Sequence, residues 1–378
     1  MKLLKNCFLF NPEKMGKKDI LFSSNQIISI EDEIDITGVS NIQIHDMKNR
    51  FVVPGFIDNH VHITGGGGEG GFSTRIDPIT ADDIYKSGVT TLIGLLGTDG
   101  TTRTIEDLFA KAKSLNEKNI TAYILTGSYR VPVKTLTGSI IRDIVFIDNI
   151  IGTGEIAISD HRSSYPSRDE IIKIITDSAR GGLLADKAGV VNFHVGKDKK
   201  GIEDLIYLVK NYDISPKNIL PTHMNRSKYL LREGIKYIKE GGFIDLTASS
   251  SSKDYRSKAE DFNFLIESGA DIGKITFSSD GQGSLPRFNP EGKFLKMGVG
   301  KLNSLHETFK SLIIDFNFKL EEALLPITRT PSKIYKLDKK GEIKTGGDSD
   351  FVVLNRDTYD IDFVISGGKY VFKNKKNL

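Results

Sequence analysis

"GFIDNHVHITGGGGEGG", Gly55–Gly71, is the stretch from which the fold of this chain can be deduced. It joins an apolar run, two histidines one residue apart, and a glycine-rich loop that holds a single glutamate. The apolar run predicts a buried strand. Side chains two residues apart on a strand point to the same face, so His60 and His62 can reach one metal ion. A His-x-His pair alone is only moderately specific, and the surrounding sequence must decide.

Similar apolar runs recur along the middle of the chain, and each is followed by a stretch with helical spacing, such as "SRDEIIKIITDSAR". The runs lie near Phe56, Thr91, Ala122, Ile156, Val191, Ile219, Phe243 and Ile275. Eight β-α units at intervals of roughly thirty residues predict an α/β fold, a (β/α)8 TIM barrel over residues 54–334. An open doubly wound sheet is the alternative, which periodicity alone does not exclude.

The two ends of the chain have a different sequence pattern. Residues 1–53 and 335–378 consist of short β-branched and aromatic runs separated by glycine, aspartate and asparagine turns. We expect the two ends to fold together as a small β-sandwich domain. The predicted organisation is therefore 1–53 and 335–378 as one β domain, with the barrel inserted between them.

Composition narrows the classes of function. Charged residues make up 27% of the 378 residues, the formal net charge is +3, and acids and bases are interspersed, so neither nucleic acid nor membrane is indicated as a partner. No apolar run approaches a membrane span, and the first residues lack the features of a signal peptide. The only cysteine, Cys7, excludes an intramolecular disulfide and any multi-thiolate metal site, which fits a reducing cytoplasm.

Metal-binding side chains stand where the predicted strands end. His60 and His62 follow the first strand, His194 the fifth, His223 the sixth and Asp280 the eighth. A single histidine at a strand end is more often a hydrogen-bonded structural residue than a ligand. The ordered set nevertheless predicts a metal site, because barrel active sites lie at the carboxyl ends of the strands. His45, His161 and His306 lie outside this pattern, although His161 is close to the expected mouth.

Several of these segments resemble a known family. "PGFIDNHVHI", the later histidines, Asp280 and the β domain resemble the amidohydrolase superfamily of metal hydrolases. "HVHITGGGGEGG", "LTGSYRVPVKTLTGSI", "AISDHRSS", "LPTHMNRS" and "FSSDGQGS" are similar to the isoaspartyl (β-aspartyl) dipeptidases within it. The resemblance implies two Zn²⁺ ions that share a hydroxide. It implies that His60, His62 and Asp280 bind one ion, and that His194 and His223 bind the other.

The bridging ligand is where this chain departs from the family. The family has a carboxylated lysine at the end of strand four, before the "AISDHR" motif, whereas this chain has Glu155 in "GTGEIAISDHR". A glutamate can bridge two cations through its two oxygens. Its carboxyl carbon lies about three bonds closer to the backbone, so the strand must supply a few ångströms of reach. We predict a bridging Glu155; the alternative is a polar strand-end residue and a single metal.

The expected chemistry is hydrolysis of an amide. A metal lowers the pKa of bound water and polarises the scissile carbonyl. Asp280 beside that water could take its proton and return it to the leaving amine. Tyr129, in "TGSYRVP", matches the family tyrosine that hydrogen-bonds the developing oxyanion, a role that suits a phenol. Without the resemblance, Tyr129 would be read as an aromatic that packs beside a strand end.

The substrate expected from the resemblance is a β-aspartyl dipeptide, which carries one ammonium and two carboxylates. Glu69, Arg162 and Arg226 supply the matching charges, since arginine forms a planar fork for carboxylates. Family contacts also match Gly67, Thr98 and Ser284. Other arginines near these motifs are expected to be solvated surface charges: Arg130, Arg142 and Arg168.

Gly65, Gly67 and Gly70 formally satisfy the dinucleotide-binding pattern G-x-G-x-x-G. The context argues against it, because Glu69 would repel a pyrophosphate and the histidines upstream would stay unexplained. The glycines instead allow the backbone to approach a substrate.

The sequence therefore predicts a cytoplasmic dizinc hydrolase of β-aspartyl dipeptides, and the resemblance adds a homo-oligomer, an octamer in the family. Two alternatives stay open. One is another amidohydrolase activity, dihydroorotase-like or that of an N-acyl-amino-acid deacylase. The other is a catalytically silent scaffold, which typically loses metal ligands that this chain retains.

Overall fold

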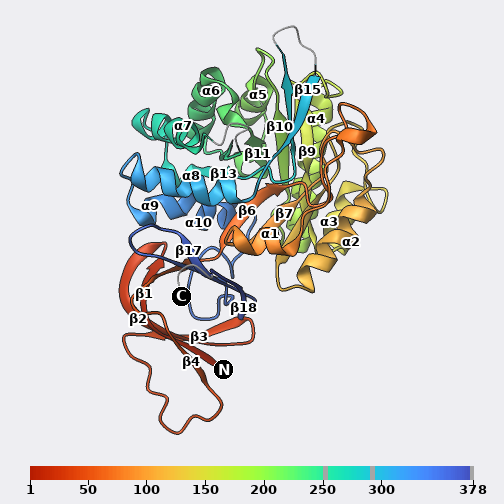
Figure 1. Cartoon of the computed structure of the whole chain (residues 1–378). Helices are drawn as coiled ribbons and strands as arrows, with labels where there is room; N and C mark the ends of the chain where they lie inside the picture. Colours follow the sequence, from red (N-terminus) through yellow and green to blue (C-terminus); the bar gives the residue numbers. More distant parts are fainter. Residues whose placement is uncertain (250–253, 290–293, 375–378) are drawn as a thin grey trace.

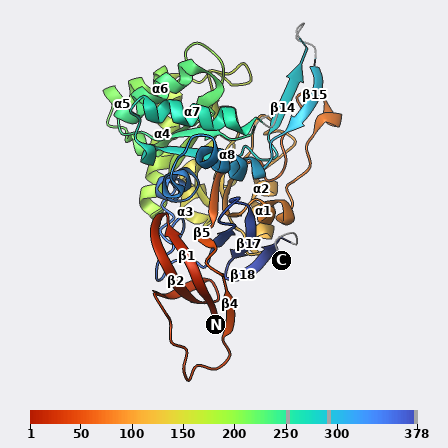
Figure 2. The ribbon, with the colours of Figure 1, turned by 60° about the vertical axis from the view of Figure 1, so that its left-hand side comes forward.

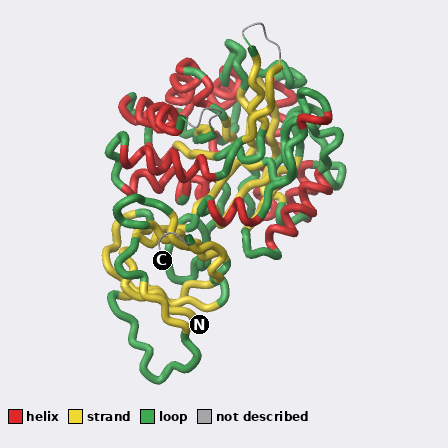
Figure 3. Tube along the Cα trace, in the orientation of Figure 1, coloured by secondary structure: helices red, strands yellow, loops and turns green. Residues whose placement is uncertain are grey.

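The computed structural model describes residues 1–249, 254–289 and 294–374. A helix-rich part lies above a strand-rich part, and both ends of the chain lie in the strand-rich part (Figures 1 and 3). None of the described helices is both long enough and apolar enough to span a membrane.

Eight parallel strands form the centre of the helix-rich part. Six pair in sequence order in one sheet, and the last two pair with each other. They are β6 (Phe56–Val61), β7 (Val89–Gly94), β8 (Thr121–Thr126), β9 (Ile150–Ile158), β10 (Val190–Val195), β11 (Ile219–Thr222), β12 (Ile244–Thr247) and β13 (Ile275–Ser278). Almost every residue in them is buried, as expected of parallel strands covered on both faces.

The parallel sheet is curled. β12 packs beside β11 and β13 packs beside β6. Beyond β13, Gly281 forms a parallel bridge with Val61, and its carbonyl accepts a hydrogen bond from the His62 amide at 2.9 Å. The last strand therefore returns to the first, which brings the carboxyl ends of distant strands to one mouth and argues against the open doubly wound sheet.

Helices cover the outside of the curled sheet (Figure 1). They are α1 (Ala81–Lys86), α2 (Ile105–Asn116), α3 (Ile140–Phe146), α4 (Arg168–Ala185), α5 (Glu203–Asn211), α6 (Lys228–Lys239), α7 (Tyr255–Glu267), α8 (Asn303–Ile314), α9 (Leu320–Leu324) and α10 (Arg329–Ile334). Short 3₁₀ turns are η1 (Phe72–Thr74), η2 (Pro216–Asn218), η3 (Met224–Arg226), η4 (Ile272–Lys274) and η5 (Leu325–Ile327). Local signals set the start and the buried face of α4: Ser167 and Glu170 form a capping box, and Ile171, Ile174 and Ile175 bury one face.

The strand-rich part is one eight-stranded sheet that combines both ends of the chain. Its strands are β1 (Lys2–Asn11), β2 (Glu13–Ser23), β3 (Gln26–Glu31), β4 (Gln43–Asp46), β5 (Phe51–Pro54), β16 (Phe351–Leu354), β17 (Ile361–Ser366) and β18 (Lys369–Lys373). β16 runs antiparallel to β5, with Val352 opposite Val53. Cys7 is buried in its core as an ordinary strand residue, and burial raises the pKa of its thiol.

A hairpin that the sequence did not reveal stands above the mouth of the parallel strands. It consists of β14 (Ser284–Phe288) and β15 (Phe294–Val299), which project away from the rest of the chain (Figure 2). Ser284 and Leu285, at its base, line the cavity described below.

Candidate active site

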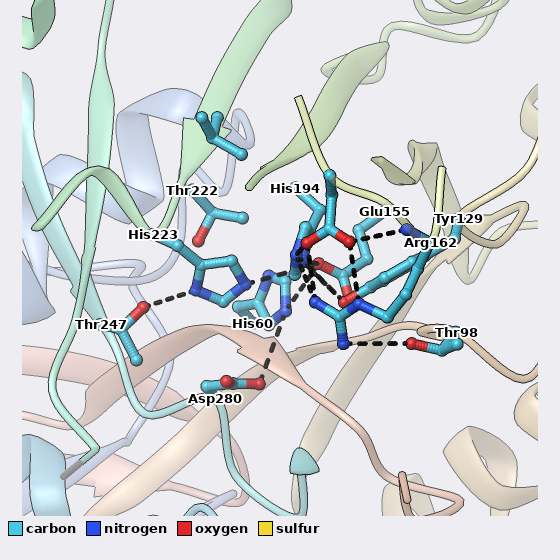
Figure 4. Close-up of polar contacts among 12 residues, drawn as sticks. His60, Thr98, Tyr129, Glu155, Arg162, His194, Thr222, His223, Thr247 and Asp280 are labelled. Carbon is cyan, nitrogen blue, oxygen red and sulfur yellow. Dashed lines mark hydrogen bonds and ion pairs between the residues drawn. The ribbon is translucent and has the colours of Figure 1, made fainter. Parts of the chain in front are cut away.

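His60, in β6, and His62, directly after this strand, meet Asp280, which follows β13. His60 Nε2 lies 3.8 Å and His62 Nε2 lies 3.2 Å from Asp280 Oδ1. Potential ligand atoms of these three side chains lie within 4.8 Å of one another, and all three residues are buried. His60 and Asp280 point toward one another in Figure 4. This is the first of the two predicted ligand groups.

Glu155 lies among four imidazoles. Its carboxylate oxygens are 2.9 Å from His194 Nδ1, 3.4 Å from His60 Nε2, 3.5 Å from His62 Nε2 and 3.6 Å from His223 Nε2. His60, Glu155 and His223 form a second group whose ligand atoms are mutually within 4.8 Å. His60 belongs to both groups and the Glu155 carboxylate also faces His62, so this carboxylate adjoins both groups, which is the position that a bridging ligand requires.

An irregularity in β9 brings the short Glu155 side chain to this position. The pairing of β9 with β10 shifts between Val191 and Phe193, so that Gly154 and Glu155 together face Asn192. Such a bulge re-aims a side chain. A Cβ on Gly154 would come within 2.8 Å of the Asn192 carbonyl oxygen, so the close approach requires glycine. The expectation that Glu155 ends its strand was wrong, because β9 continues beyond it.

The electrostatics of this centre favour cations. Burial acts to raise the pKa of Glu155, but His60 and His194 hold it well below its usual range. Burial likewise opposes ionisation of Asp280, whose pKa is nevertheless about 2 because of His62 and His223. Burial acts to lower the pKa of His60, but the negative charges of Glu155 and Asp280 outweigh burial and raise this pKa to about 9. Two buried carboxylates are therefore anionic at neutral pH.

Several polar atoms of the centre have no hydrogen-bond partner. Among the described residues, these buried atoms include both ring nitrogens of His60, Nδ1 of His62 and Oε1 of Glu155. Buried polar groups left unpaired are costly. Histidine nitrogens and carboxylate oxygens are common zinc ligands, so the residues present fit a metal centre.

Neighbouring side chains orient two of the imidazoles. His194 Nε2 lies 3.1 Å from Asp160 Oδ2, and His223 Nδ1 lies 2.6 Å from Thr247 Oγ1. With a metal ion bound beside Glu155, His194 Nε2 and His223 Nδ1 would donate to these two oxygens, and the other ring nitrogen of each histidine would turn its lone pair to the ion. Partners of this kind fix the tautomer of metal-binding histidines. Sequence reasoning missed both; the quoted "AISDHR" segment holds Asp160, but nothing in the sequence singled out Thr247.

Asp160 also holds one of the predicted substrate arginines. Its two oxygens accept hydrogen bonds from Arg162 Nε at 2.9 Å and Nη2 at 2.8 Å, a bidentate pair. Arg226 Nη1 lies 3.8 Å from Asp160 Oδ2 and donates to the Val195 carbonyl at 2.7 Å. The same carboxylate thus joins the predicted carboxylate-binding groups to His194.

Tyr129 points into the same centre. Its hydroxyl lies 2.7 Å from His194 Nδ1, and Arg162 packs over its ring at 5.1 Å. Burial, together with Glu155, raises the pKa of Tyr129 well above its usual value. The phenol therefore stays protonated and can donate a hydrogen bond.

A cavity of about 530 Å³ opens above the carboxylates and histidines. Glu69 Oε1 accepts a hydrogen bond from Ser284 Oγ at 2.6 Å and lies 3.6 Å from Arg162 Nη1 and 3.5 Å from Thr98 Oγ1. The predicted residues in its lining are His62, Gly67, Glu69, Thr98, Tyr129, Arg162, His194, His223, Arg226, Asp280 and Ser284. His60 and Glu155 lie buried and contact this lining, so the structure gathers every predicted site residue in one place.

The glycine-rich loop forms one wall and is held by a residue that the sequence did not single out. Arg103 Nη2 donates to the Gly66 carbonyl at 2.7 Å and Nε donates to the Thr64 carbonyl at 3.3 Å. Gly67 has φ +73°, and a Cβ there would meet the Thr74 carbonyl oxygen at 2.5 Å. Only glycine fits this conformation without strain.

The remaining histidines lie as expected. His161 is exposed at the rim of the cavity, and His45 and His306 lie outside the lining, in β4 and α8. Two lysines that the sequence did not single out also line the cavity, Lys197 and Lys258.

Known proteins match this chain along most of its length. A structure of β-aspartyl dipeptidase from the thermophilic keratin-degrading Fervidobacterium islandicum AW-1, in complex with β-Asp-Leu, is 44% identical, with a TM-score of 0.91 over 98% of this chain and 96% of that one. A second structure of that enzyme is 42% identical, with a TM-score of 0.90 over 98% and 97%.

A dihydroorotase from Fusobacterium nucleatum subsp. nucleatum is 35% identical over 127 residues, which are 33% of this chain. The match spans only 28% of the length of that dihydroorotase. The model of the amidohydrolase family matches residues 51–371 of this chain, which include all the strands of the curled sheet and every residue of the site. The chain belongs to the amidohydrolase family.

Proposed function

We propose that this chain is a metal-dependent β-aspartyl dipeptidase that hydrolyses isoaspartyl dipeptides. The observation that carries the proposal is the position of Glu155 between two groups of imidazoles, beneath a cavity that presents one acid and two arginines. Identity of 44% to a β-aspartyl dipeptidase with β-Asp-Leu bound supports the same substrate class.

The proposed centre holds two zinc ions. His60, His62 and Asp280 would hold one ion, His194 and His223 the other, and Glu155 would bridge them. Metal ions bound there would polarise the scissile carbonyl and acidify a water molecule. The unpaired nitrogens of His60 and the unpaired Oε1 of Glu155 support this assignment.

The protein's own groups would then move the protons. Asp280, anionic and at the edge of the cavity, would accept a proton from the attacking water and return it to the leaving amine. Tyr129, which stays protonated, would donate a hydrogen bond to the oxygen that becomes negative in the transition state. Burial strengthens both interactions because water is largely excluded.

The cavity walls would recognise the charged ends of the dipeptide. Glu69 would accept hydrogen bonds from the ammonium, and Arg162 and Arg226 would bind the two carboxylates. Gly67, Thr98 and Ser284 would add further contacts. Ser284 is already hydrogen-bonded to Glu69 at 2.6 Å, which supports a shared role in this wall.

The remaining sequence predictions become part of this proposal. We propose that the eight parallel strands close into a (β/α)8 barrel, residues 54–334, and that residues 1–53 and 335–378 form one β-sandwich domain. The return of β13 to β6 supports the barrel, and the single sheet shared by both ends supports their folding as one domain. The cytoplasmic location and the homo-oligomer, octameric by family resemblance, stay predictions.

One assay tests the proposal. The purified protein is given β-Asp-Leu and α-Asp-Leu, and metal is counted on the same sample. We expect a strong preference for the β-linked dipeptide and close to two equivalents of metal. Equal rates on both dipeptides would contradict the substrate assignment, as would turnover of dihydroorotate or an acyl-amino acid but of neither dipeptide. One equivalent of metal would contradict a bridging role for Glu155. Protein without bound metal would favour a catalytically silent scaffold.

A further inference from the structure

Lys258 is a cation in the cavity wall that the proposed reaction does not use. It lies in the first turn of α7 and lines the cavity. Its side chain is partly buried, yet no hydrogen bond or ion pair joins it to another described residue. The two substrate arginines, in contrast, already have partners in the protein, Arg162 at Asp160 and Arg226 at the Val195 carbonyl.

The acids nearest to Lys258 are engaged elsewhere. Asp254 and Asp261 attract the ammonium. However, Asp254 Oδ1 accepts a hydrogen bond from the Ser257 amide at 3.1 Å as the cap of α7, and Asp261 Oδ1 accepts one from Lys228 Nζ at 3.2 Å. Burial lowers the pKa of Lys258, and Arg226 lowers it further. A partly buried ammonium beside another cation is best stabilised by an incoming anion.

The three charges that every β-aspartyl dipeptide carries can be bound without Lys258. Under the proposed function, Glu69, Arg162 and Arg226 bind the ammonium and the two carboxylates that every β-aspartyl dipeptide carries. Lys258 is therefore available for a charge that only some dipeptides have. The second residue of the dipeptide is where such a charge can vary.

We propose that Lys258 binds a carboxylate in the side chain of the second residue, so that β-aspartyl dipeptides ending in glutamate or aspartate are preferred substrates. This inference rests on the proposed function and adds the substrate class. A hydrogen-bonded ion pair at a partly buried position raises kcat/KM by about tenfold or more.

The test compares β-Asp-Glu with β-Asp-Gln, which have nearly the same shape and differ by one charge. For the wild-type enzyme we expect kcat/KM to be about tenfold higher for β-Asp-Glu. Lys258→Met should reduce this ratio to about one, and Lys258→Arg should retain most of it. Lys197→Met is the matched control, because Lys197 lines the same cavity but is exposed, so that solvent screens its charge.

The outcomes separate the two levels of the proposal. If the wild-type enzyme hydrolyses neither β-Asp-Gln nor β-Asp-Leu, the proposed function itself is wrong. If it hydrolyses them but shows no preference for β-Asp-Glu, the role of Lys258 is wrong. A preference that survives in Lys258→Met, or that disappears equally in Lys197→Met, also overturns the inference.

Discussion

Replacement of Glu155 by glutamine tests the centre of the proposed mechanism. Glutamine keeps the shape of the side chain and removes its negative charge. Because ligand atoms of His60, Glu155 and His223 lie within 4.8 Å of one another, a cation bound to one oxygen of the carboxylate would lie about 3 Å from the centre of its delocalised charge. At an effective dielectric constant of about 20, the lost attraction is about 5 kcal/mol per unit of cation charge.

That energy corresponds to metal binding weaker by more than about a thousandfold. We therefore expect Glu155→Gln to lose the metal held beside this carboxylate during dialysis against a mild chelator, and kcat/KM for β-Asp-Leu to fall by at least about a thousandfold. Metal analysis and the peptidase assay are performed on one sample. Circular dichroism checks that the variant is folded.

Glu69→Gln is the matched control, because it removes one acid from the same cavity without touching the ligand groups. It should retain the wild-type metal content. If Glu155→Gln keeps close to two equivalents of metal and normal turnover, the reasoning about the bridge is refuted. Loss of metal from both variants would point to a general change of the site instead.

Three further predictions follow from individual contacts. Asp160→Asn removes the charge partner of Arg162 and the carboxylate beside His194. We expect kcat/KM to fall at least about tenfold and chelators to remove metal more readily. Unchanged sensitivity to chelators would contradict the role of Asp160 at His194. Glu69→Gln should abolish the preference for β-Asp-Leu over succinyl-Leu, which lacks the ammonium, and a preserved preference would show that Glu69 is not its partner. Burial lowers the pKa of His306 to about 4. As the pH falls below about 6.5, the imidazole is therefore protonated in the unfolded chain but not in the folded protein. From this group alone, metal-free protein should lose about 2.5 kcal/mol of unfolding free energy by about pH 4.5. Urea unfolding of wild type and His306→Gln at pH 7.5 and 4.5 measures the difference, and an equal pH dependence in both would contradict it.

Periodicity and local signals were sufficient for the strands and helices of the parallel sheet, but they did not reveal the hairpin of β14 and β15. Each of the eight apolar runs is a strand, and the capping residues of α4 are visible in the sequence at Ser167 and Glu170. The spacing of His60 and His62 also placed both imidazoles on one side of the first strand. These features depend on neighbours in the chain, which is why they can be read without the tertiary structure.

Long-range geometry decided the rest. The resemblance named Glu155, but its reach depends on a bulge formed against Asn192 of the next strand. Asp160 and Thr247 became part of the site only when the fold set them against His194 and His223. Lys258 had no sequence signal, because its importance lies in the partners that it lacks among the described residues.

The sequence by itself determined the alternation of strands and helices around the parallel sheet, the ligand types and, through resemblance, the chemistry that they indicate. Only the tertiary structure decided the curl that brings Asp280 to His62, the distances around Glu155 and the surplus charge at Lys258. The physical reason is that alternation along a strand, which is local, decides which face of the sheet a side chain occupies. Strand order, register and packing between segments that lie far apart in the chain decide which other side chains it contacts on that face.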